Sequence, residues 1–188
     1  MKRSVISIFL VLLLVAPLTF AKTISNVNVP ETFKAGKTKL VLNGAGLREK
    51  NFMELMVYAL YTKKKTGDPE AIINANEPMA VKAWIIMDVL NSENLTAGYN
   101  DMFSRSLGRN GKAALAKEIA KFNSIFKEKV SVGDVYDYVY IPGKGTKTYK
   151  NGKYKTTIKG LAFKKGLIGG WLARGAEDSK LKLKLLGN

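Results

Sequence analysis

The pattern of apolar and polar residues after residue 21 first predicts strands. Val27 and Val29 alternate with polar neighbours, which indicates a short edge strand. Residues 39–42 form a second predicted strand, and the glycines of residues 43–46 then predict a bend. Residues 52–61 are apolar at nearly every position, as in a strand covered on both faces. Residues 80–87 read as another apolar strand.

The middle of the chain changes to helical spacing. A short helix is predicted over residues 69–73, with Asp68 as N-cap and Pro69 in the first helical position. A longer helix is predicted over residues 93–107, capped by Ser92. A third follows over residues 112–126, where one apolar stripe recurs with helical spacing: Leu115, Ile119, Phe122 and Phe126.

Strand patterns return in the last third of the chain. Residues 135–141 alternate in the manner of a strand, and residues 147–158 predict a hairpin around Asn151-Gly152, the pair preferred in type I′ turns. Residues 160–173 predict a helix, whereas residues 180–186 fit either a strand, by their Lys-Leu alternation, or a last helix. The order of elements favours an α+β fold, a large antiparallel β-sheet with a layer of helices packed on one face.

The first residues have the pattern of a secretory signal peptide. Lys2 and Arg3 precede an apolar run over residues 5–16, and small residues stand at −3 and −1 of a cleavage site after Ala21. The alternative is a membrane anchor, but the run is shorter than the ~20 apolar residues that span a bilayer. We therefore expect a signal peptide over residues 1–21, a single domain over residues 22–188 and a periplasmic location.

Composition removes several kinds of chemistry. The 188 residues include no Cys and no His. Disulfides, thiolate nucleophiles and Ser-His-Asp triads are therefore excluded, and a metal site would need oxygen ligands. We expect no metal, no cofactor and no assigned catalytic residue.

The chain is strongly basic, with a formal net charge of +16. Lysines cluster at residues 63–65 and at Lys180, Lys182 and Lys184, but elsewhere they are scattered among acidic residues. Scattered charge is typical of a solvated surface. No nucleic-acid recognition motif is present, so we expect no nucleic-acid partner. Weak contact with an anionic envelope surface is the alternative interpretation of the charge, and we expect a monomer.

A set of short motifs resembles the chalcone isomerase superfamily, and more specifically its exported bacterial chalcone isomerase-like proteins. The resemblance begins with Asn-Gly-Ala-Gly-Leu-Arg at residues 43–48 and continues through the strand that ends at Tyr61. Later matching pieces follow in the order of the family: Gly133-Asp134, Tyr140-Ile141-Pro142-Gly143, Asn151-Gly152-Lys153 and Trp171-Leu172. The resemblance implies an open-faced β-sandwich, in agreement with the fold class argued above.

The superfamily contains both cyclising enzymes and fatty-acid-binding proteins, and both use an Arg that matches Arg48. A guanidinium suits either task, because it stays charged and presents a fork to a carboxylate or phenolate. The Thr of the enzymes matches Met56, whose thioether donates no hydrogen bond. Tyr99 is the nearest match to their helical Tyr, whereas their later Asn and Thr match Ser106 and Lys159. The resemblance therefore implies the fold and a cavity, and it disfavours the cyclisation reaction.

The leading hypothesis is a periplasmic, non-enzymatic binding protein for an apolar carboxylate such as a fatty acid. Arg48 would anchor the head group and Tyr99 would donate a second hydrogen bond. An apolar cavity would be lined by Met53, Met56, Phe103 and Trp84. The alternative is an isomerase or intramolecular lyase acting on a phenolic or enone substrate. A third interpretation is a structural domain of the envelope whose cavity has closed.

Overall fold

The computed structural model describes residues 22–176 and 178–188, so the predicted signal peptide lies outside the described residues. Its centre is an antiparallel sheet of seven strands in the order β3-β4-β5-β6-β7-β8-β9, in which every strand pairs with its neighbours in sequence. The strands of this sheet are β3 (Thr32–Ala35), β4 (Thr38–Lys50), β5 (Met53–Thr62), β6 (Met79–Ile85), β7 (Val135–Ile141), β8 (Gly145–Lys150) and β9 (Lys153–Ile158). A separate hairpin is formed by β1 (Lys22–Ile24) and β2 (Val27–Val29).

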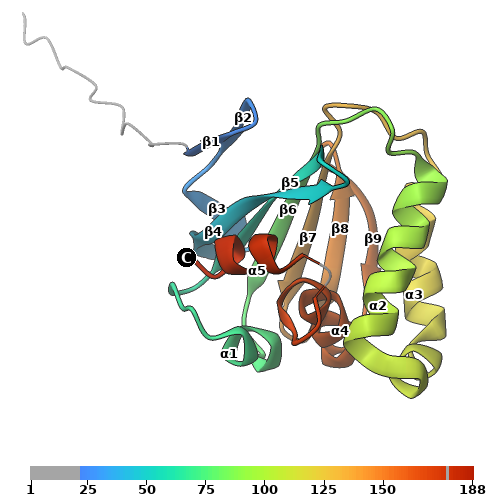
Figure 1. Ribbon diagram of the computed structural model, residues 1–188. Helices are drawn as coiled ribbons and strands as arrows, with labels where there is room; N and C mark the ends of the chain where they lie inside the picture. The colour runs from blue at the N-terminus through green and yellow to red at the C-terminus, as the bar shows by residue number, and fades with distance from the viewer. Residues whose placement is uncertain (1–21, 177) are drawn as a thin grey trace, which may run out of the picture.

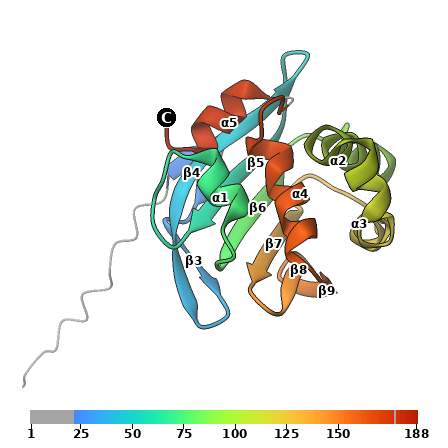
Figure 2. The same cartoon turned by 90° about the horizontal axis from the view of Figure 1, so that it is seen from below.

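The helices lie on one face of this sheet (Figures 1 and 2). They are α1 (Pro69–Asn74), α2 (Ser92–Ala114), α3 (Ala116–Asn123), the 3-10 turn η1 (Ser124–Phe126), α4 (Leu161–Leu172) and α5 (Ser179–Leu185). This arrangement confirms the predicted α+β fold. Among the described residues, no helix combines the length and hydropathy needed to cross a membrane.

Two hydrophobic cores explain the alternation along the central strands. Tyr136 and Tyr138 of β7 are buried in the core beneath the helices, together with Phe122 of α3 and Phe163 of α4. Val139 of the same strand points to the opposite face, where a smaller core forms with residues of β2 to β6. A strand buried on both faces needs no polar side, and this is why residues 55–61 are uniformly apolar. The predicted strand over residues 52–61 started too early, because Phe52 is exposed in the turn before β5 and Met53 is exposed at its first position.

From the sequence we expected the glycines of residues 43–46 to end a strand, and this prediction was wrong. They lie inside β4, which continues to Lys50 with a register shift between Leu42 and Gly44. Their role is close packing, because α5 crosses directly over them. A Cβ atom at Gly44 would lie 2.1 Å from the carbonyl oxygen of Lys184. The open question about residues 180–186 is also settled, since they belong almost entirely to the helix α5.

The predicted helices exist, with different ends. Asp68 caps α1 as predicted, but the cap of α2 is Asn91, whose Oδ1 accepts a hydrogen bond from the Asn94 amide at 2.8 Å. Helix α2 kinks at Gly108, which has a positive φ of 66°, and then continues to Ala114. The predicted helix over residues 112–126 is therefore divided among the end of α2, α3 and η1.

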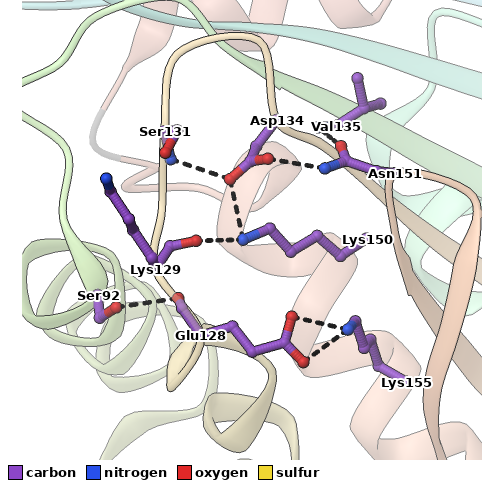
Figure 3. Close-up of polar contacts among 9 residues, drawn as sticks. All are labelled: Ser92, Glu128, Lys129, Ser131, Asp134, Val135, Lys150, Asn151 and Lys155. Carbon is purple, nitrogen blue, oxygen red and sulfur yellow. Dashed lines mark hydrogen bonds and ion pairs between the residues drawn. The ribbon is translucent and has the colours of Figure 1, made fainter.

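A buried ionic cluster fixes the loop between η1 and β7. The Asp134 carboxylate accepts hydrogen bonds from the Ser131 amide (2.9 Å) and the Asn151 side chain (2.7 Å), and it pairs with the Lys150 ammonium at 2.9 Å (Figure 3). Lys150 also donates to the carbonyl oxygen of Lys129. Burial alone raises the pKa of Asp134, but the hydrogen bonds from Asn151, Lys150 and Ser131 outweigh it and lower the pKa. The cluster thus ties this loop to the β8–β9 hairpin.

Candidate functional site: a cleft between the sheet and three helices

A cleft of about 590 Å³ opens on the helix-covered side of the sheet, between the β4–β5 hairpin and the helices α2, α4 and α5. This volume is in the range of small-molecule sites. The inner wall is mainly apolar and is formed by Leu55, Tyr58, Leu95, Tyr99, Met102, Gly170, Trp171 and Leu181. The rim is mainly polar and includes Arg48, Lys50, Asn51, Met53, Val89, Asn94, Asp101, Arg105 and Asp178.

Arg48 reaches across this cleft from the sheet toward α2. It stands in β4, paired with Met56 of β5, and its side chain is half-buried. A Cβ atom added at Gly98 of α2 would lie 3.9 Å from its Nη1 atom, so the guanidinium lies beside this glycine. Because a guanidinium is always protonated, Arg48 brings a permanent positive charge to the rim.

A cluster of buried tyrosines stands deeper in the cleft. The hydroxyl groups of Tyr99 and Tyr138 are hydrogen-bonded at 2.7 Å, and the Tyr99 ring stacks on Phe126 at 5.0 Å between centroids. Burial raises the pKa of Tyr99 well above its ordinary value, and the neighbouring hydroxyls of Tyr138 and Tyr58 raise it further. Tyr99 is therefore a neutral phenol that exchanges hydrogen bonds and does not act as a base near neutral pH.

A ligand would compete for the hydrogen bonds of the tyrosine cluster. The Tyr99 hydroxyl is hydrogen-bonded with those of both Tyr138 and Tyr58, so an incoming oxygen atom would replace one of the bonds within the cluster. The Tyr58 hydroxyl, which also lines the cleft, donates to the Met56 sulfur at 3.1 Å. A thioether is a weak acceptor, so a carboxylate oxygen would compete well for that proton.

Of the six side chains predicted to contact a ligand, Arg48, Tyr99 and Met53 line the cleft. The structure does not bring the other three there. Met56 is buried beneath Tyr58, and Phe103 is fully buried against Phe122 and Phe163. Trp84 lies on the opposite face of the sheet, under the ammonium group of Lys82 at 5.5 Å. Because side chains alternate along β6, Trp84 points away from the helix-covered face, where its neighbours Ala83 and Ile85 are buried. For the three residues at the cleft, a role in ligand binding stays a prediction.

Sequence reasoning missed several lining residues. Tyr58 lies in a strand that is apolar on both faces, so the pattern did not show which side chains meet a cleft. Trp171 and Gly170 belong to α4. Gly170 lets α2 pack closely on this helix, because a Cβ atom at Gly170 would lie 2.1 Å from the Cγ atom of Met102. Leu181 belongs to the tail that the pattern left open between strand and helix. If the tail had been taken as a helix, Leu181 could have been predicted to lie on its buried face.

The carboxylates at the rim already have structural partners. Asp101 forms an ion pair with Arg105, and the Oδ1 atom of Asp178 accepts the Leu181 amide at 2.8 Å as the N-cap of α5. Within residues 22–176 and 178–188, no three His, Cys, Asp or Glu side chains gather in a way that could hold a metal ion. The arrangement offers a cation, neutral phenols and apolar walls, which suit the binding of an amphipathic anion.

The described residues thus form an open-faced α+β sandwich with a basic group at the rim of a mainly apolar cleft. The chain belongs to the chalcone isomerase-like family, whose sequence profile matches residues 21–187. A similar solved structure is that of a fatty-acid binding protein from Arabidopsis thaliana, with a TM-score of 0.72 and 15% sequence identity over 89% of this chain and 96% of the plant chain. At this identity, the likeness shows the shared fold. No functionally curated protein matches the sequence.

Proposed function

We propose that this protein is a periplasmic, non-enzymatic binding protein for an apolar carboxylate such as a fatty acid. The observation that carries the proposal is the position of Arg48 at the rim of a mainly apolar cleft whose depth contains neutral tyrosines. The plant protein that shares the fold is described as a fatty-acid binding protein, which supports the same interpretation.

In the proposed complex, the carboxylate lies at the rim and the hydrocarbon chain lies inside. The Arg48 guanidinium would bind the carboxylate, with hydrogen bonds from the phenols of Tyr58 or Tyr99. The hydrocarbon would pack against the apolar wall formed by Leu95, Met102, Trp171 and Leu181. Met102 adapts its shape readily, which suits a flexible chain.

One observation supports export and cleavage after Ala21. The family match covers residues 21–187, so nearly all of the proposed signal peptide lies outside it. Native mass spectrometry of the protein purified from the periplasm would test this together with the ligand. The expected protein mass is that of residues 22–188, and organic extraction should release a stoichiometric long-chain acid.

The decisive variant is Arg48→Ala, with Arg109→Ala as the matched control because Arg109 is exposed and lies outside the cleft. Hydrogen bonds to charged groups contribute about 1.5–3 kcal/mol, so Arg48→Ala should weaken fatty-acid affinity by roughly 10- to 150-fold. Arg48→Lys should bind with intermediate affinity, because it keeps the charge and loses the fork. Circular dichroism should show an unchanged fold in all three variants.

Two results would contradict the proposal. One is a wild-type protein that neither carries a fatty acid nor takes up added fatty acid. The other is an Arg48→Ala variant that binds as tightly as wild type. Turnover of small phenolic enones that is lost in Arg48→Ala would instead favour the isomerase alternative. An empty protein without turnover would favour a structural role in the envelope.

A further inference from the structure

The tip of the β4–β5 hairpin carries an aromatic residue that the fold does not use. Phe52 is fully exposed, at 104% of its reference area, in the two-residue turn Asn51-Phe52. Both turn residues have positive φ angles, 51° and 63°. The same chain builds its β8–β9 hairpin on Asn151-Gly152, with positive φ angles of 51° and 74°. The second turn has glycine where the first has phenylalanine.

Phenylalanine is unfavourable at this position for two reasons. A bulky side chain is disfavoured in the left-handed region, where glycine is the usual residue. A fully exposed ring also buries no apolar surface within the protein. Glycine at residue 52 would suit this turn better, as Gly152 shows in the other hairpin. Intramolecular packing therefore does not explain Phe52, and the side chain is available to a partner.

Phe52 belongs to a group of exposed apolar residues at one end of the sheet. Met53 and Val89 are exposed to 36% and 45% and border the cleft. Val132 is 55% exposed, in the loop whose Gly133 amide donates to the Ile85 carbonyl oxygen at the end of β6, 2.9 Å away. Figure 2 shows the β4–β5 hairpin projecting beyond the body of the molecule. We name Phe52, Met53, Val89 and Val132 the apolar tip.

We propose that the apolar tip docks on a lipid bilayer, with the Phe52 ring inserted among the lipid chains. The inference extends the proposed function and rests on it in one respect, since a membrane-dissolved fatty acid would enter the cleft from the side where Met53 and Val89 form its rim.

The area and the charge favour a bilayer over a protein partner. One Phe ring buries about 150–250 Å², whereas a stable protein interface takes about 800 Å² from each partner. A few side chains on separate loop tips are thus a small protein interface, but each can insert separately into lipid. The exported protein loses Lys2 and Arg3 with the signal peptide but stays strongly basic, and this charge also attracts the whole molecule to an anionic membrane.

The test is sedimentation of the exported protein with vesicles of phosphatidylethanolamine and phosphatidylglycerol. Phe52→Gly should lower the partition coefficient at least tenfold, while its melting temperature stays the same or rises, because glycine suits the turn. Leu183→Ala is the matched control, since Leu183 is another exposed apolar residue, 52% exposed on α5, and it should bind vesicles within twofold of wild type. In Phe52→Trp, the tryptophan emission should shift to shorter wavelength when vesicles are added.

Several results would overturn this inference. They are a wild-type protein that does not sediment with vesicles, a Phe52→Gly variant that sediments as wild type does, an equal loss in Leu183→Ala, or dimers in solution that depend on Phe52. The proposed function is tested separately by fatty-acid binding without vesicles, which Phe52→Gly should retain and Arg48→Ala should lose. If vesicle binding depends on Phe52 but no fatty acid binds, docking stands and the proposed ligand is wrong.

Discussion

Replacing Gly44 with alanine tests how α5 is held on the sheet. In the structure, a Cβ atom at Gly44 would lie 2.1 Å from the Lys184 carbonyl oxygen and 2.7 Å from that of Leu185. Both obstacles are backbone atoms, so no side-chain rotation relieves the clash. Helix α5 has to move away from β4, and with it move the buried side chains of Leu181 and Leu185.

The size of the effect follows from two contributions. Overpacking of a close contact costs about 1–3 kcal/mol. Moving α5 also breaks the buried hydrogen bond from the Asn43 side chain to the Leu185 carbonyl oxygen, 2.8 Å long, which contributes about 1 kcal/mol. We expect Gly44→Ala to lower the free energy of unfolding by about 2–4 kcal/mol. Because Leu181 lines the cleft, ligand affinity should fall as well.

The measurement is urea denaturation, followed by tryptophan fluorescence. Gly67→Ala is the matched control, because a Cβ atom there would lie 3.8 Å from the Leu186 carbonyl oxygen, an ordinary contact with the end of the same helix. It should change the free energy of unfolding by less than about 0.5 kcal/mol. If Gly44→Ala were as stable as Gly67→Ala, the account of these glycines as a seat for α5 would be wrong.

Two further predictions concern buried polar groups. The Lys164 ammonium donates to the carbonyl oxygens of Ile72, Ile73 and Ala75 at 2.8, 2.9 and 2.8 Å. Lys164→Met should therefore lower the free energy of unfolding by about 2–4 kcal/mol, whereas the control Lys165→Met should stay close to wild type. Equal stability of the two variants would refute this role of Lys164. Burial is the first cause that raises the pKa of six tyrosines in the folded protein, including Tyr140 and Tyr149. The rise is largest for Tyr61, Tyr99, Tyr136 and Tyr138. Tyrosines of the unfolded chain ionise near pH 10, so the contribution of these four to stability is constant below that pH and falls above it, by about 1.4 kcal/mol for each of them at pH 11. Tyrosinate absorbance at 295 nm should then rise together with unfolding, and complete ionisation in a folded sample would contradict the prediction.

Much of the fold was determined locally by the sequence. Alternation of apolar residues located β7, helical spacing located the stripe of α3, and Asn151-Gly152 located the β8–β9 turn. These signals are readable because backbone geometry repeats every 2 residues in a strand and every 3.6 in a helix. Asp68 and Pro69 marked the start of α1 for an equally local reason, since an N-cap acts within one turn.

The cleft was decided by the tertiary structure. Met56 and Tyr58 are both buried residues of the same strand, but only Tyr58 lines the cleft, because α2, α4 and α5 leave their gap there. The sequence predicted a bend at the glycines of β4, whereas in the structure α5, about 140 residues later, packs on them. The local spacing of apolar residues predicts that a side chain is buried. Which side chains it contacts depends on how elements distant in the sequence pack together. The sequence could therefore predict the sheet and single out Arg48, and only the packed chain could show which side chains face it across the cleft.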